Sequence, residues 1–150
     1  MSNHQRQSVR IIGGRWKGRK INFSEETGVR PTGNKIRETL FNWLRAELPN
    51  ARCLDLFAGS GALGLEALSR GANNVKFIER DRETAFCIKR SLSSLKDEST
   101  GDEVVCTDAI EWLEQNKEIF DIVFIDPPFG SNLIYETCRK VEETATANKL

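Results

Sequence analysis

The chain is poor in the residues that most often build metal sites and disulfide scaffolds. Its one histidine, His4, lies in a polar segment and cannot by itself form a His-based zinc site or a Ser-His-Asp triad. Its four cysteines are far apart and form no C-x-x-C pair, which indicates reduced thiols: Cys53, Cys87, Cys106 and Cys138. We therefore expect no metal site.

Long apolar runs are missing as well. No stretch approaches the roughly 18 apolar residues that a membrane span requires, and residues 1–6 lack the apolar core of a secretory signal. These features indicate a cytoplasmic protein. The 150 residues, of which 39% are hydrophobic, suffice for one domain with a buried core.

The absence of net charge hides an uneven distribution. Residues 1–37 hold nine Lys or Arg and two acidic residues, a balance of +7. The remaining residues hold 13 basic and 20 acidic side chains, a balance of −7. The basic segment either binds a polyanion such as nucleic acid or is a solvated tail, and charge alone favours neither interpretation.

The pattern within the basic segment favours nucleic acid. Val9–Ile12 and Arg19–Phe23 are typical of two short strands, joined through the glycine-rich residues 13–18. The apolar residues of these strands are not typical of a disordered tail. A hairpin that carries cations and an aromatic ring is suited to contact the phosphates and a base of a nucleic acid. We therefore predict that residues 1–33 form a basic arm, with a β-hairpin, that binds nucleic acid.

A helix is predicted next, over Lys35–Leu48. Its apolar residues recur at helical spacing and would share one face: Ile36, Leu40, Trp43, Leu44 and Leu48.

Beyond this helix, strand-like runs alternate with helical segments. Strands are expected over Arg52–Phe57, Val75–Glu79, Glu103–Thr107 and Phe120–Ile125, and helices over Ala62–Ser69, Arg82–Leu95, Ala109–Gln115 and Leu133–Glu142. Strands separated by helices of this length imply right-handed crossovers and a parallel sheet with helices on both faces. Residues 34–150 are thus predicted to form one α/β domain.

Three strand ends carry groups suited to a nucleotide-like ligand. Residues 55–64 contain the G-x-G-x-x-G pattern, which permits a tight turn and close ligand approach but also fits a dinucleotide site. Glu79 ends the second strand, where a carboxylate can accept hydrogen bonds from ribose hydroxyls. Asp108 follows the third strand and is an acceptor for an adenine amine, the N-cap of the next helix, or both.

The fourth strand ends in Asp126-Pro127-Pro128-Phe129, which favours methylation of an exocyclic amine. Such an amine is a poor nucleophile because its lone pair is delocalised into the ring. The Asp126 carboxylate and a carbonyl near Pro127 can accept its two N–H groups and favour the developing positive charge. Phe129 offers a face on which a flipped base can stack. A nicotinamide-dependent oxidoreductase has no evident use for this turn.

The sequence closely resembles the bacterial small-subunit (16S) ribosomal RNA guanine methyltransferases of the RsmD type. The resemblance runs from about residue 10 to about residue 140 and is carried by residues 10–20, 30–32 with 37–44, 55–71 and 126–129. It implies a Rossmann-like class I S-adenosylmethionine-dependent methyltransferase fold. It also implies methyl transfer from S-adenosyl-L-methionine to the 2-amino group of one guanine in 16S ribosomal RNA. A monomeric enzyme would meet that RNA within a small-subunit assembly intermediate.

Carried over to matching positions, the resemblance implies three groups of site residues. The cofactor would be bound by Asp55, Phe57, Gly59, Ser60, Gly61, Glu79, Asp108 and Ala109. The guanine would be received by Asp126, Pro127, Pro128 and Phe129. The RNA would be bound by Arg10, Arg15, Trp16, Lys17, Arg19, Lys20, Arg30, Thr32 and Arg37.

Proteins of this type continue for some tens of residues beyond position 150 and there complete a seven-stranded sheet. We therefore expect that the last strands are missing, that the strand carrying Asp126 lies at an exposed edge, and that stability and activity are reduced. The alternatives are a DNA amino-methyltransferase, which could use the same turn, and a catalytically impaired RNA-binding remnant.

Overall fold

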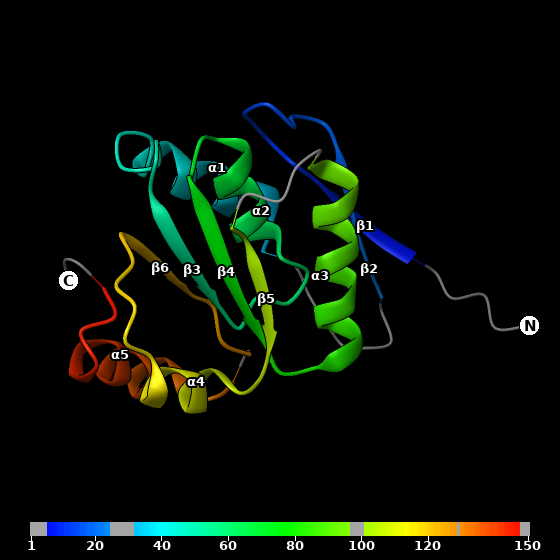
Figure 1. Cartoon of the computed structure of the whole chain (residues 1–150). Coiled ribbons are helices and arrows are strands. Elements are labelled where there is room, and N and C mark those ends of the chain that lie inside the picture. The colour runs from blue at the N-terminus through cyan, green and yellow to red at the C-terminus, as the bar shows by residue number, and fades with distance from the viewer. Residues whose placement is uncertain (1–5, 25–31, 97–100, 129, 148–150) are drawn as a thin grey trace, which may run out of the picture.

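The centre of the molecule is a parallel sheet of four strands (Figure 1). The computed structural model describes residues 6–24, 32–96, 101–128 and 130–147. The strands are β3 (Arg52–Leu56), β4 (Asn74–Glu79), β5 (Glu103–Cys106) and β6 (Ile122–Ile125), in the order β5-β4-β3-β6. The predicted α/β fold is confirmed, and β6 lies at an edge of the described sheet. A single parallel bridge between Phe120 and Ala147 lies beside that edge.

Helices cover both faces of this sheet, because its buried strands are apolar on both sides. The N-terminal arm, α1 (Asn34–Trp43), α2 (Ala62–Ser69) and α3 (Arg82–Leu95) share one core with Cys53 and Phe77. On the other face, α4 (Ala109–Gln115) and α5 (Leu133–Glu143) pack with Leu54 and Ile78. Neighbouring strand residues thus alternate between the two cores.

Helix α1 differs from its prediction in length and in its buried face. It ends at Trp43 instead of Leu48. Arg37 and Phe41 are buried, whereas Ile36 is 65% and Trp43 77% exposed. The predicted apolar face was therefore wrong at Ile36 and Trp43, whereas Leu48 is buried and Leu40 and Leu44 pack against the core. The physical reason lies in tertiary contacts. The helix directs Arg37 toward the buried acid Glu66, and the centroid of the Phe41 ring lies 5.7 Å from that of Phe124.

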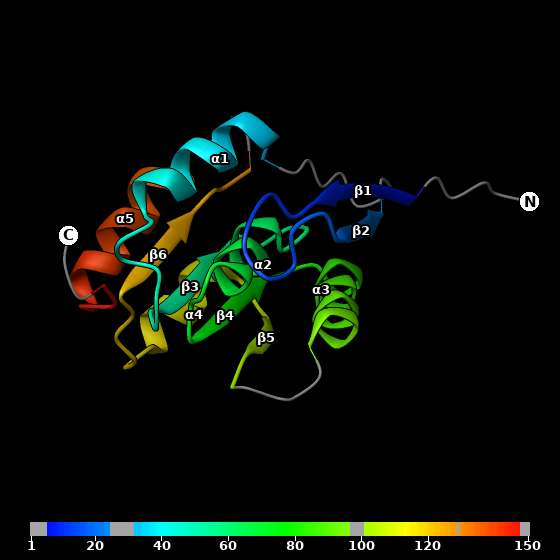
Figure 2. The ribbon, with the colours of Figure 1, turned by 90° about the horizontal axis from the view of Figure 1, so that it is seen from above.

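The predicted hairpin is confirmed, with its first strand shifted toward the N-terminus. Strands β1 (Arg6–Arg10) and β2 (Lys20–Ser24) pair antiparallel, with Val9 opposite Ile21. The hairpin lies beside α3, away from the edge strand β6 (Figure 2). Ile11, Ile21 and Phe23 are buried against the domain, so the described part of the arm is packed structure and not a solvated tail.

Candidate functional site

The candidate site lies where the carboxyl ends of the parallel strands meet. From β3 the chain crosses to β4 on one side, while β6 pairs with β3 on the other. The strand order therefore reverses at β3. In open α/β sheets this reversal creates the crevice in which ligands bind.

The glycine turn after β3 has the backbone shape that the sequence predicted. Phe57, Gly59 and Gly61 all have positive φ, at 56°, 58° and 81°, so the chain turns sharply between strand and helix. Gly64 serves another purpose, since an added Cβ would lie 2.2 Å from Cε1 of Phe77. Its missing side chain lets α2 pack closely against the sheet.

Glu79 is held rigidly at the end of β4. Its Oε1 accepts a hydrogen bond from the Gly59 amide at 3.1 Å, and its Oε2 accepts one from the Asp81 amide at 2.8 Å. The residue is only partly buried, so lone pairs remain for a ligand. The carboxylate thus joins the glycine turn to the end of β4.

Asp55 supports the same turn from inside. It is 1% exposed, and its Oδ2 accepts a hydrogen bond from the Gly64 amide at 3.0 Å. Burial raises the pKa of Asp55 well above its usual range, the Gly64 hydrogen bond opposes this, and the charges of Asp126 and Glu79 add to the rise. The predicted direct contact of Asp55 with a cofactor is thereby corrected, because the carboxyl lies beneath the turn and is not open to a ligand.

The remaining predicted cofactor residues divide by exposure. Ser60 and Ala109 are buried, and the Ser60 hydroxyl accepts a hydrogen bond from the Ala62 amide at 3.3 Å. Asp108 is partly exposed and is the N-cap of α4, accepting hydrogen bonds from the amides of Ile110 and Glu111 at 3.0 and 3.1 Å. The capping role is confirmed, and the adenine role stays a prediction.

The turn after β6 presents Asp126 to solvent. Its Oδ2 accepts a hydrogen bond of 2.8 Å from the hydroxyl of Thr32, which precedes α1. The carbonyl of Pro128 accepts hydrogen bonds from the amide and the hydroxyl of Ser131, and these bonds hold the end of the turn that leads toward α5. Phe129, the predicted stacking face, lies outside the described residues.

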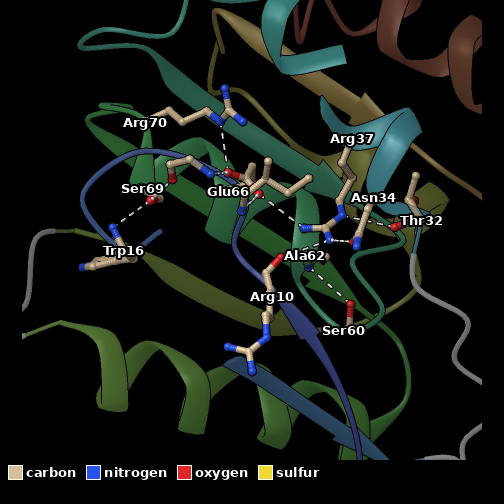
Figure 3. A network of polar contacts seen from close by, with 12 residues as sticks. Arg10, Trp16, Thr32, Asn34, Arg37, Ser60, Ala62, Glu66, Ser69 and Arg70 are labelled. Atoms are coloured by element: carbon tan, nitrogen blue, oxygen red, sulfur yellow. Dashed lines mark hydrogen bonds and ion pairs between the residues drawn. The ribbon is translucent and has the colours of Figure 1, made fainter. Parts of the chain in front are cut away.

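A buried acid that the sequence reading missed, Glu66 of α2, anchors the arm (Figure 3). Its Oε1 accepts hydrogen bonds from the Ile12 amide at 2.9 Å and Arg37 Nη1 at 3.3 Å. Its Oε2 accepts them from the Gly13 amide and Arg70 Nε, both at 3.0 Å. A single acid within an otherwise apolar helix was the sequence signal for such a buried partner network.

Two predicted RNA contacts are corrected by this packing. Arg37 is 0% exposed and its guanidinium is committed to Glu66 and to backbone carbonyls, so it cannot reach RNA. Trp16 is 7% exposed, and its amide donates to the Ser69 hydroxyl at 3.0 Å. Its ring packs in the core, so it cannot serve as an open stacking platform.

The other predicted cations of the arm remain on the surface. Arg10, Arg15, Lys17, Arg19 and Lys20 are exposed. The guanidinium of Arg15 lies over the Trp16 ring at 4.4 Å, and Arg19 donates to the Ser94 carbonyl of α3 at 3.0 Å. Arg30 lies outside the described residues.

No group of three or more His, Cys, Asp or Glu residues in the described part of the chain could hold a metal ion. None of the described helices is long and apolar enough to cross a membrane.

Comparisons with known proteins agree with this arrangement. A family model described as "Conserved hypothetical protein 95" matches residues 9–149. Ribosomal RNA small subunit methyltransferase D of Haemophilus influenzae is 49% identical over 127 residues, which cover 83% of this chain and 66% of that protein. The chain thus spans about two thirds of the length of this curated relative.

Solved structures share the fold. The protein yhhF from Escherichia coli has 43% identity and a TM-score of 0.81, over 92% of this chain and 73% of that one. A SAM-dependent methyltransferase from Agrobacterium tumefaciens has 18% identity and a TM-score of 0.61, over 85% of this chain and 41% of that one. The expected class I methyltransferase fold is confirmed.

Proposed function

Because the chain belongs to the family described as conserved hypothetical protein 95, we propose that it is an S-adenosyl-L-methionine-dependent methyltransferase acting on small-subunit ribosomal RNA. The acceptor would be the exocyclic 2-amino group of one guanine. A relative that is 49% identical is named a ribosomal RNA small subunit methyltransferase, and this chain covers 66% of its length. We therefore propose this activity for the chain on the basis of the site that its own residues form.

The residues around the glycine turn fit the cofactor. The positive φ of Gly59 and Gly61 makes the tight turn that such a cofactor site requires, and the fixed Glu79 carboxylate can accept hydrogen bonds from ribose hydroxyls. The partly exposed Asp108 can accept from an adenine amine. When bound, S-adenosyl-L-methionine supplies a methyl group activated by a positively charged sulfur.

The turn after β6 would receive the acceptor amine. The Asp126 carboxylate and the Pro127 carbonyl would accept its two N–H groups and hold the nitrogen in line with the methyl carbon. Held in this way, the nitrogen would keep its lone pair free to accept the methyl group, and the Asp126 charge would stabilise the positive charge that develops on the nitrogen. The amine gives up one proton, toward Asp126 or water. The observation that carries this proposal is geometric: Glu79 bonds to the Gly59 amide of the glycine turn, and Asp126 directly follows β6, which pairs with β3 up to Leu56, where that turn begins.

The exposed cations of the arm would bind the RNA backbone. The arm is fixed to α2 through Glu66, so its cations hold a defined position relative to the methyl-transfer site. Phosphate contacts of this kind position a nucleic acid without reading its sequence.

Transfer of tritiated methyl to under-methylated small ribosomal subunits tests the reaction. The purified chain should label the RNA, and mapping should identify a single guanine N2 position. Asp126→Asn should lower kcat at least about a hundredfold while cofactor affinity by calorimetry is unchanged, because the lost charge faces the acceptor. Glu136→Gln, at an exposed acid of α5, is the matched control. Labelling of DNA instead of ribosomal RNA would identify a DNA amino-methyltransferase and refute the proposed acceptor.

The salt dependence of binding tests the arm. Replacing Arg15, Lys17 and Arg19 together by Ala should weaken RNA binding and lower the slope of log affinity against log salt by about 0.7 to 0.9 for each lost phosphate contact. The charge-matched control replaces three exposed cations outside the arm, Arg45, Lys117 and Arg139. Equal effects of the two triple variants would show that the arm is no dedicated RNA site.

A further inference from the structure

One hydrogen bond connects the segment before α1 to the turn that receives the acceptor. The Thr32 hydroxyl donates to Oδ2 of Asp126 at 2.8 Å, across 94 residues of sequence. Asp126 is exposed, so without this contact its carboxylate could rotate freely in water. The bond holds one of the two carboxylate oxygens and fixes the direction in which the other points.

The backbone of Thr32 is itself held by a buried group (Figure 3). Arg37 Nε donates to the Thr32 carbonyl at 3.1 Å. The same guanidinium donates to Glu66 at 3.3 Å, to the Arg10 carbonyl at 3.1 Å and to Asn34 Oδ1 at 2.6 Å. Because the planar Arg37 guanidinium donates hydrogen bonds to four acceptors, its position is fixed, and it anchors the Thr32 backbone to the interior of the protein.

This chain of contacts links the glycine-turn helix to the acceptor side of the site. Glu66 lies in α2, the helix that begins directly after the glycine turn. From Glu66 the contacts run through Arg37 to the Thr32 backbone, and from the Thr32 hydroxyl to Asp126. The position of the Asp126 carboxylate is thereby tied to the element that would hold the cofactor.

We propose that Thr32 is a positioning residue for methyl transfer. Its hydroxyl occupies Asp126 Oδ2 and leaves Oδ1 aimed to accept an N–H of the guanine amine. The inference rests on the proposed function, because it assigns Thr32 a role toward the acceptor that Asp126 would bind. The separate prediction that Thr32 contacts RNA stays a prediction.

Kinetics of three variants test the proposal. Thr32→Val keeps the size of the side chain and removes the donor, so kcat should fall about ten- to hundredfold, with the KM for RNA and the cofactor affinity unchanged. Thr32→Ser retains the hydroxyl and should restore most of the loss. Thr39→Val, at an exposed threonine of α1, is the matched control and should behave as wild type.

Crystal structures of the wild-type and Thr32→Val chains give a readout that needs no turnover. Asp126 should occupy one carboxylate orientation in the wild type and a different or mixed set in the variant. The same Asp126 orientation in both structures would refute the proposal. A faster Thr32→Val enzyme, or a change confined to the KM for RNA and its salt slope, would also refute it. If the wild-type chain transfers no methyl, the proposed function fails, and the crystallographic comparison still decides whether Thr32 fixes Asp126.

Discussion

Replacing Glu66 by Gln should destabilise the protein strongly although the side chain keeps its shape. The carboxylate accepts hydrogen bonds at both oxygens, from two arm amides and from two guanidinium groups. A glutamine has one accepting oxygen, and its NH₂ group would face donors wherever it is placed. Two of the four bonds are lost, and the buried Arg37 is left without a counter-charge.

The expected magnitude follows from burial. Both Glu66 and Arg37 side chains are fully buried, and burial lowers the pKa of Arg37 while Glu66 opposes that change. Removing one partner of a buried ion pair costs about 3 to 5 kcal/mol. That is a large part of the roughly 5 to 15 kcal/mol that stabilises a typical domain. We therefore expect Glu66→Gln to leave a marginally stable chain.

Urea denaturation measures this loss. With a slope of about 1 to 3 kcal/mol per molar urea, the midpoint should fall by at least about 1 M relative to wild type. Glu47→Gln, at an exposed position just after α1, removes the same charge outside the network and should leave the midpoint unchanged. A Glu66→Gln midpoint within about 0.3 M of wild type would refute the reasoning, since the buried pair would then contribute nothing measurable.

Further predictions concern groups beneath the site. Burial raises the pKa of Asp55, so the folded protein binds this proton more tightly than the unfolded chain does. The stability that Asp55 contributes is therefore complete below about pH 4 and is lost as pH rises through the folded-state pKa. In urea titrations, Asp55→Asn should match or exceed the wild-type free energy of unfolding at pH 7 and converge with it near pH 3. Gly64→Ala, whose methyl carbon would lie 2.2 Å from Phe77, should destabilise by about 1 to 3 kcal/mol, whereas Gly33→Ala, with nothing within 4 Å, should not. Burial raises the pKa of the Cys53 thiol to about 12, so a disulfide reagent should modify Cys53 only as the protein unfolds, while the exposed cysteines react in the native state.

The sheet was predictable from the sequence because each strand is bounded by strong local signals. Apolar runs end in turns that carry Gly59, Glu79, Asp108 and Asp126, and the structure places all four at the carboxyl edge of the sheet. The glycine pattern also predicted the tight turn between β3 and α2. Local chemistry was sufficient for these features.

The buried face of α1 was only partly predictable from periodicity, which correctly selected Leu40 and Leu44. Apolar spacing selected Ile36 and Trp43, which are exposed, while the helix buries Arg37. That choice depends on Glu66, an acid 29 residues away that requires a counter-charge in the core. The hydrogen bond from Thr32 to Asp126 is equally non-local. Such pairs depend on how the elements pack, and no single segment encodes them.

The attachment of the arm to α2 has a consequence for the order of events during synthesis. Ile11 and Ile21 find their apolar partners, and the loop at Ile12 its acceptor, only once Glu66 and the elements around it exist. Roughly forty residues separate the hairpin from that helix, which at about 5 to 20 residues per second is several seconds of translation. Throughout that interval the arm carries apolar side chains without their folded-state partners and a surplus of positive charge, beside a ribosome built of RNA.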